Sequence, residues 1–173
     1  GFMGFAISWI AVSGKEPQRV LDELKLSRTG EREEFPESDL TCTKLPGPWF
    51  LVFANEFDSQ ITSEQALRSL SSGCKLISCQ VEEHVMFSSA ACYSDGAQVW
   101  RVEHDAQQSI YHLSATGSPP TQLEEAHQKL KQEQDNAGGA EADVDYIFDV
   151  PVVVAQAITS YRHDMEIDGA DSE

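Results

Sequence analysis

The chain has 173 residues, and its 29 acidic residues outnumber the 12 basic ones, which leaves a formal net charge of −17 at pH 7. A field of this sign repels nucleic-acid phosphates and anionic lipid headgroups, so we expect no nucleic acid or membrane partner, whereas a basic protein is favoured. No apolar stretch reaches the ~18–20 residues of a membrane-spanning helix. The chain also lacks a glycine-rich nucleotide loop and any HExxH, GxSxG or CxxC motif.

Length and composition predict a single domain. The hydrophobic fraction of 40% is sufficient for a core, which we expect within residues 3–165, with residues 166–173 as an acidic flexible tail. Gly1-Phe2 is interpreted as an added leader before a native start at Met3. The apolar run Phe5–Val12 is too short for a secretory signal and has no basic flank, so we expect a cytoplasmic protein.

Two apolar runs, Phe5–Val12 and Trp49–Ala54, predict central strands because they are apolar on both faces. Between them, Pro17 suits the first turn of a helix. Residues 27–48 are rich in acidic residues and contain three prolines. They are predicted to form a long connection, which in a compact domain is usually functional or disordered.

Three further helices are indicated by capping and turn residues. The segment Thr62–Gln65 fits a capping box with Thr62 as the N-cap, and Gly73 would stop that helix in the left-handed conformation. Thr121 and Glu124 form a second capping box. The apolar segment that follows Pro151 is predicted to be a buried helix, since proline suits its first turn.

A β region is expected from Cys74 to about Gly117. Its predicted strands are Lys75–Val81, His84–Tyr93, Ala97–His104 and Ser109–Ala115. A two-residue turn at Asp95-Gly96 would place Phe87 opposite His104, Ala91 opposite Trp100 and Tyr93 opposite Gln98. On this register Ala91, Tyr93, Trp100 and Val102 share one core face. The whole pattern predicts the α+β class, with a largely antiparallel sheet of about five or six strands and about four helices.

The most prominent polar cluster in the sequence combines Glu82 and His84 with Glu103, which the predicted register brings to one end of the hairpin. A carboxylate beside a histidine holds one tautomer and raises its basicity, so these residues are candidates for general acid/base catalysis or for binding a divalent metal. The alternative is a solvated outer face of the sheet with cross-strand ion pairs. His104 would face Phe87 and is expected to be a satisfied histidine at the edge of the core.

Asp143, Asp145 and Asp149 have the spacing D-x-D-x-x-x-D, which could gather oxygen ligands for a hard cation. The segment lacks the glycine and the bidentate glutamate of an EF-hand loop. Carboxylates before a helix are also favoured by the helix dipole alone, so no cofactor is predicted.

The connection 27–48 is the candidate partner-binding surface, because carboxylates on a partly anchored loop speed the encounter with a basic protein. The alternative is a solvated connection without a role. The candidate residues are Glu31, Glu33, Glu34, Glu37 and Asp39.

The four cysteines are expected to be buried free thiols, since a domain of this length needs no disulfides. Two functions remain open. The first is a non-catalytic acidic interaction module, such as an inhibitor or an immunity protein that neutralises a toxic enzyme, by analogy of size and charge. The second is a small enzyme that uses Glu82, His84 and Glu103. The absence of catalytic motifs favours the first.

Overall fold

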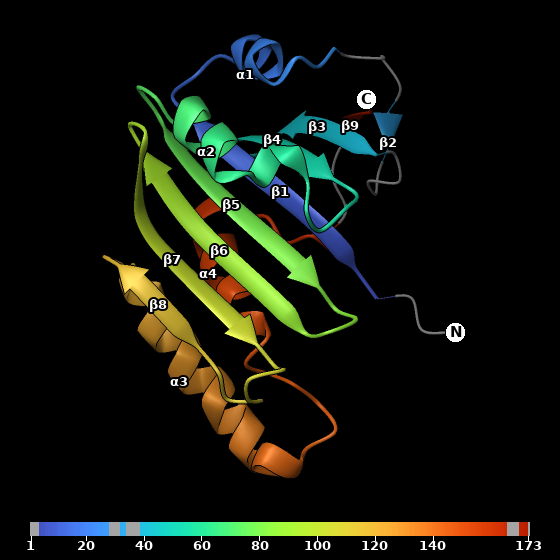
Figure 1. The fold of residues 1–173 in the computed structure, drawn as a ribbon, viewed down its shortest axis with the longest axis vertical. Coiled ribbons are helices and arrows are strands. Elements are labelled where there is room, and N and C mark those ends of the chain that lie inside the picture. The colour runs from blue at the N-terminus through green and yellow to red at the C-terminus, as the bar shows by residue number, and fades with distance from the viewer. Residues whose placement is uncertain (1–3, 28–31, 34–38, 166–169, 173) are drawn as a thin grey trace.

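The computed structural model describes residues 4–27, 32–33, 39–165 and 170–172, and its main feature is one antiparallel sheet flanked by helices (Figure 1). Each strand pair is antiparallel, in the order β2-β9-β3-β4-β1-β5-β6-β7-β8. The predicted α+β class is confirmed. The predicted strand number was too low, because the described residues form seven strands of four or more residues and the two short strands β2 and β9. None of the described helices is both long and apolar enough to cross a membrane.

The strands are β1 (Ala6–Ser13), β2 (Arg32–Glu33), β3 (Leu40–Lys44), β4 (Phe50–Ala54), β5 (Lys75–Glu82), β6 (Phe87–Ser94), β7 (Ala97–Asp105), β8 (Ser114–Gly117) and β9 (Ala170–Ser172). The helices are α1 (Pro17–Leu24), α2 (Glu64–Leu70), α3 (Thr121–Asn136) and α4 (Asp149–Thr159). Two short 3-10 helices, η1 (Gln60–Thr62) and η2 (Gly139–Glu141), precede α2 and follow α3.

Helices cover both faces of the sheet, which divides the core into two layers. On one face α3 and α4 pack over Trp9, Leu51 and Trp100. On the other face α1, η1 and α2 pack over Ile10 and Val52. Successive residues of a strand point to opposite faces, so a central strand must be apolar throughout. The prediction that residues 5–12 and 49–54 form central strands is therefore confirmed: β1 lies between β4 and β5, and β4 lies between β3 and β1.

The predicted connection 27–48 contains part of the sheet. Leu40–Lys44 forms β3, which pairs along its whole length with β4, and residues 32–33 form β2. The alternating sequence Leu-Thr-Cys-Thr-Lys has the period of a strand, although its acidic and proline-rich surroundings suggest a loop. Within the predicted tail, residues 170–172 form β9, which lies between β2 and β3.

The Asp95-Gly96 hairpin is present, but its register changes after one step. Tyr93 pairs with Gln98 as predicted, whereas Cys92 pairs with Trp100, which leaves Val99 as an extra residue in β7. This bulge shifts the rest of the hairpin by one residue, so Phe87 lies opposite Asp105 rather than His104.

The bulge also changes which residues share a face. Trp100 and Val102 face the α3/α4 layer together with Cys92, whereas Ala91 and Tyr93 face the α1/α2 layer. The single core face predicted for these residues was wrong.

Helix boundaries follow the predictions more closely than helix caps do. The helix at Pro151 is confirmed as α4, with Pro151 in its first turn. Ser63, rather than Thr62, caps α2 by accepting a hydrogen bond from the Ala66 N–H at 3.2 Å. Pro120 is the N-cap of α3, so the capping box predicted at Thr121 does not form.

The strand predicted at residues 109–115 begins only at Ser114.

Candidate functional site

Glu82 and His84 form a close pair at the end of β5. Oε1 of Glu82 lies 2.5 Å from Nδ1 of His84 and also accepts a hydrogen bond from the His84 backbone N–H at 3.0 Å. The His84 side chain is 61% exposed, and among the described residues its Nε2 has no hydrogen-bond partner. A carboxylate on one ring nitrogen orients the imidazole and leaves the other nitrogen available for proton transfer.

Glu103 does not join this pair. It lies on β7, and β6 separates β7 from β5 in the sheet. Its Oε2 lies 3.6 Å from Nη2 of Arg101. In the part of the chain that the structure describes, no group of three or more His, Cys, Asp and Glu side chains could hold a metal ion. The predicted three-residue cluster is therefore reduced to the Glu82–His84 pair.

His104 is fully buried and satisfied, as predicted, but its neighbours differ from the prediction. It pairs across the hairpin with Ser88 rather than with Phe87. Its Nδ1 lies 2.5 Å from the carbonyl oxygen of His112, and its Nε2 lies 2.7 Å from Oδ2 of Asp145. The imidazole thus joins β7, the loop before β8 and the segment that leads into α4.

Ser88, His104 and Asp145 are the residue types of a hydrolase triad, but their contacts are those of a buried structural network. The Ser88 hydroxyl is buried and donates to the carbonyl oxygen of Phe148 at 2.7 Å. Both nitrogens of His104 face other oxygen atoms, so neither can take a proton from Ser88. A nucleophilic serine needs such a base within hydrogen-bond reach.

Asp143, Asp145 and Asp149, the last of which begins α4, have separate surroundings. Asp145 holds His104 and accepts a hydrogen bond from the Phe148 N–H at 3.1 Å. Asp149 lies 3.2 Å from Nη2 of Arg162. Burial raises the pKa of Asp149, although Arg162 opposes that shift. Asp143 is exposed, so the structure does not bring the predicted oxygen cluster together.

All four cysteines are free thiols, as predicted, but Cys74 is only partly buried, whereas the prediction of burial is confirmed for Cys42, Cys79 and Cys92. Burial raises the pKa of Cys79 to about 12 and also raises the pKa of Cys92 and of Cys74. A thiol is a good nucleophile only as the thiolate. These shifts therefore give no indication of an activated cysteine.

Of the acidic residues predicted to bind a partner, Asp39 is the one that the structure places in a site. Glu31, Glu34 and Glu37 lie outside the described residues, and Glu33 is described only as part of strand β2. Asp39 is exposed at the start of β3 and lines a groove of about 860 Å³.

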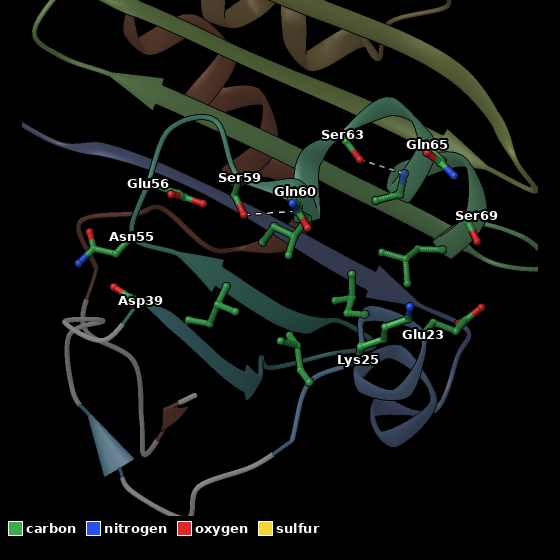
Figure 2. A pocket seen from close by; sticks show the side chains of 16 residues that line it. Glu23, Lys25, Asp39, Asn55, Glu56, Ser59, Gln60, Ser63, Gln65 and Ser69 are labelled. Atoms are coloured by element: carbon green, nitrogen blue, oxygen red, sulfur yellow. Dashed lines mark hydrogen bonds between the residues drawn. The ribbon is translucent and has the colours of Figure 1, made fainter.

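Figure 2 shows the lining of this groove. It lies on the α1/α2 side of the sheet, between the end of α1, the start of β3, the end of β4 and the η1–α2 segment. Its floor is apolar and its rim is polar. We call the six apolar lining residues, which are buried or partly buried, the floor: Leu24, Leu26, Leu40, Ile61, Ala66 and Leu70. The polar lining residues, which are exposed apart from the buried Ser59, are called the rim: Glu23, Lys25, Asp39, Asn55, Glu56, Ser59, Gln60, Ser63, Gln65 and Ser69.

The rim is anchored to the sheet. The Ser8 hydroxyl on β1 donates to the carbonyl oxygen of Glu56 at 2.9 Å, and the Gln80 amide on β5 donates to the carbonyl oxygen of Phe57 at 3.2 Å. The Phe57 ring meets the Phe87 ring edge-on, with centroids 5.6 Å apart. These contacts hold the loop between β4 and η1 over the sheet, so the groove has a fixed wall.

Charge is unevenly distributed along the rim. Asp39 and Glu56 lie at one end of the groove, whereas Glu23 and Lys25 lie at the other end (Figure 2). Oε2 of Glu23 lies 2.7 Å from Nζ of Lys15, so its charge is already compensated. Within the described ranges, neither Asp39 nor Glu56 forms an ion pair. The end at Asp39 and Glu56 is therefore the negative end of the groove.

Sequence reasoning identified Asp39 but not Glu56 or the apolar floor. The floor residues come from α1, β3, η1 and α2, and no local pattern joins them. Comparison of the chain with protein-family models, with the sequences of curated proteins and with solved structures gave no match.

Proposed function

We propose that the protein is a non-catalytic interaction module that binds a basic segment of a partner protein in the groove between α1 and α2. One observation carries this proposal: the groove combines an apolar floor with a negative end formed by Asp39 and Glu56. The formal net charge of −17 supports the same kind of partner. We expect no binding to nucleic acid, because the overall field repels phosphates.

The two parts of the groove have different physical roles. Leu24, Leu26 and Leu40 are only partly buried and pack on the core beneath them, so an occupant that covers them would gain roughly 25 cal/mol for each Å² of apolar surface removed from water. The rim carboxylates act at longer range. Opposite charges raise association rates by about 10- to 1000-fold at low salt and mainly set specificity and orientation.

We also propose that this interaction takes place in the cytoplasm. The four cysteines are free thiols, and free thiols are usual in reducing compartments. An inhibitor or an immunity-type protein is the class of interaction module that best suits this size and charge, by analogy.

The experiment is a measurement of association rates by stopped-flow fluorescence, with a panel of basic proteins as ligands, at low and high salt. We expect the rate constant of a true partner to fall by at least about 10-fold as salt rises. The double variant Asp39→Asn and Glu56→Gln should lower the low-salt rate. Its matched control, Glu124→Gln with Glu125→Gln on the exposed face of α3, removes the same charge far from the groove and should have little effect.

Salt-independent rates would contradict charge-guided binding. Equal effects of the two double variants would show that net charge, rather than the groove, controls the association. Either result would overturn the proposal.

A second candidate function, general acid/base catalysis, is supported by the Glu82–His84 pair, in which the carboxylate orients an exposed imidazole. We would test it with ester and phosphoester substrates, comparing the wild-type protein with His84→Ala and with His127→Ala as a control on α3. Activity that is lost only in His84→Ala would support an enzyme. Activity that is absent, or equal in all three proteins, would remove this candidate.

A further inference from the structure

The lining of the groove also restricts the conformation of its occupant, an inference that rests on the proposed function. We infer that the partner segment binds as an amphipathic helix whose basic residues are gathered at the end that lies against Asp39 and Glu56. Two independent features of the groove lead to this inference: the state of its backbone and the arrangement of its side chains.

In the described ranges, both strands beside the groove have a strand partner on each side. An extended peptide gains affinity by adding main-chain hydrogen bonds to an open edge of a sheet. β3 is hydrogen-bonded to β4 on one side and to β9 on the other, and β4 is paired with β3 and β1. At the mouth of the groove the Asn55 N–H already donates to the carbonyl oxygen of Asp39 at 2.8 Å. Because β9 pairs with Thr41 and Cys42 in the middle of β3, strand addition is disfavoured here.

The short helical segments on the opposite wall are capped by their own side chains. Ser59 accepts a hydrogen bond from the Ile61 N–H at 3.3 Å, and Ser63 accepts one from the Ala66 N–H at 3.2 Å (Figure 2). The Ile61 and Ala66 N–H groups are thus not available to an occupant. A helical occupant satisfies its own backbone within the segment itself.

The side chains of the groove match one face of a helix. The apolar floor lies between two walls, and a helix presents its apolar residues as a single stripe at positions i, i+3, i+4 and i+7. One wall, formed by η1 and α2, carries amides and hydroxyls and no charge, namely Gln60, Ser63, Gln65 and Ser69. This wall suits uncharged polar residues beside the stripe.

The two ends of the groove differ in charge, and this difference sets the charge pattern of the occupant. At one end, Asp39 and Glu56 have no ion-pair partner in the described part of the chain. At the other end, the Glu23 carboxylate is paired with Lys15, and Lys25 adds a positive charge. Basic residues are attracted to the first end and gain nothing at the second. A helix with lysines at one end only is thus the best match.

The test compares two synthetic peptides of the same composition, in which leucines, lysines and glutamines are arranged differently. In the first peptide the leucines have helical spacing and the lysines lie at one end. In the second the leucines alternate with polar residues, as in a strand. We expect the helical peptide to bind at least about 10-fold more tightly by fluorescence anisotropy, and its helical circular dichroism to increase when it binds.

Groove variants locate the binding. Leu40→Asp should abolish binding of the helical peptide, and Val85→Asp should not, because Val85 is an exposed apolar residue in the turn between β5 and β6. Since a charge at position 40 could impair folding, Asp39→Asn with Glu56→Gln provides a second, milder test. That double variant should weaken binding and reduce its dependence on salt.

The outcomes separate the two proposals. If both peptides bind with equal affinity and both respond to the groove variants, the groove binds basic segments but the inferred helix is wrong. If the strand-like peptide binds more tightly, the inference is also overturned. If neither peptide responds to the groove variants, the proposed function itself fails, and the inference fails with it.

Discussion

Nε2 of His104 lies 2.7 Å from Oδ2 of Asp145, although the two residues are 41 positions apart in the chain. The other ring nitrogen of His104 faces the carbonyl oxygen of His112 at 2.5 Å. Both ring nitrogens of this buried histidine therefore contact oxygen atoms of other segments. This buried hydrogen-bond network ties β7 to the loop before β8 and to the segment that leads into α4.

Asp145→Ala should therefore destabilise the fold strongly. It removes the acceptor for His104 and for the Phe148 N–H and leaves a fully buried imidazole without its partner. We expect the free energy of unfolding to fall by about 3 kcal/mol, the usual scale for breaking a buried pair. Urea denaturation followed by circular dichroism measures this change.

Asp143→Ala is the control for this variant, because Asp143 is exposed two residues earlier in the same segment. Its effect should stay within about 0.5 kcal/mol, as for most surface substitutions. Equal losses in the two variants would show that the His104–Asp145 contact contributes no particular stability.

Gly117→Ala should disrupt the end of β8. Gly117 has a φ of +77°, and a Cβ atom placed on it would lie 2.1 Å from the carbonyl oxygen of Val99. Gly47 has a similar φ of +84° with no atom within 4 Å of its Cβ position. Gly47→Ala thus measures the cost of the backbone conformation alone, about 1 kcal/mol. Gly117→Ala should cost at least about 2 kcal/mol more, because the strand pairing must also shift. Equal costs in thermal unfolding would mean that the close approach to Val99 is readily relieved.

The sequence allowed the central strands and the last helix to be predicted, because their signals are local. Residues 50–54 are apolar without interruption, residues 6–12 are interrupted only by Ser8, and Pro151 marks the first turn of α4. The hairpin register was predictable only next to its turn. The bulge at Val99 lets Trp100 and Val102 face the same layer as Cys92, and this requirement comes from the packing of α3 and α4 rather than from the hairpin itself.

The candidate site shows the same limit. Asp39 could be predicted as a partner-binding residue because acidic residues are numerous around it in the sequence. Glu56 is isolated among uncharged residues of its loop, apart from Asp58, and nothing in its neighbourhood indicates that it approaches Asp39. The two residues share a rim only because β3 and β4 pair so that Leu40 lies opposite Ala54. That pairing could not be predicted while residues 27–48 were interpreted as a connection.

Thiol reactivity should distinguish Cys74 from the other three cysteines. Cys42, Cys79 and Cys92 are buried, whereas Cys74 is only half-buried and its Sγ lies 3.0 Å from the carbonyl oxygen of Leu70. Burial raises the pKa of Cys74, so we expect slow labelling near pH 7 that accelerates as the pH rises. Mass spectrometry after treatment with an aromatic disulfide should find Cys74 modified first, and Cys74→Ser should remove this phase. Rapid modification of Cys79 in the native protein would contradict the core packing described here.

His163 should make the protein less stable in mild acid. Burial lowers the pKa of His163 to about 4, and Arg162 adds to this shift while Asp164 opposes it. In the unfolded chain the ordinary histidine pKa of about 6.5 applies, so below that pH the unfolded state binds more protons than the folded state. The contribution of His163 is complete above about pH 6.5 and is lost as the pH falls toward 4, at up to about 1.4 kcal/mol per pH unit. Urea denaturation at intervals between pH 7 and pH 4.5 measures this slope.

His163→Gln should flatten the decline, because glutamine takes up no proton in this range. His84→Gln, at an exposed histidine, should retain the decline and serves as the control. The Nδ1 atom of His163 is buried without a hydrogen-bond partner in the described structure, and the ring packs edge-on against Phe5 with centroids 4.8 Å apart. A charged ring would therefore have little to stabilise it. An equally steep loss of stability in His163→Gln would mean that other titrating groups, rather than this histidine, control the acid response.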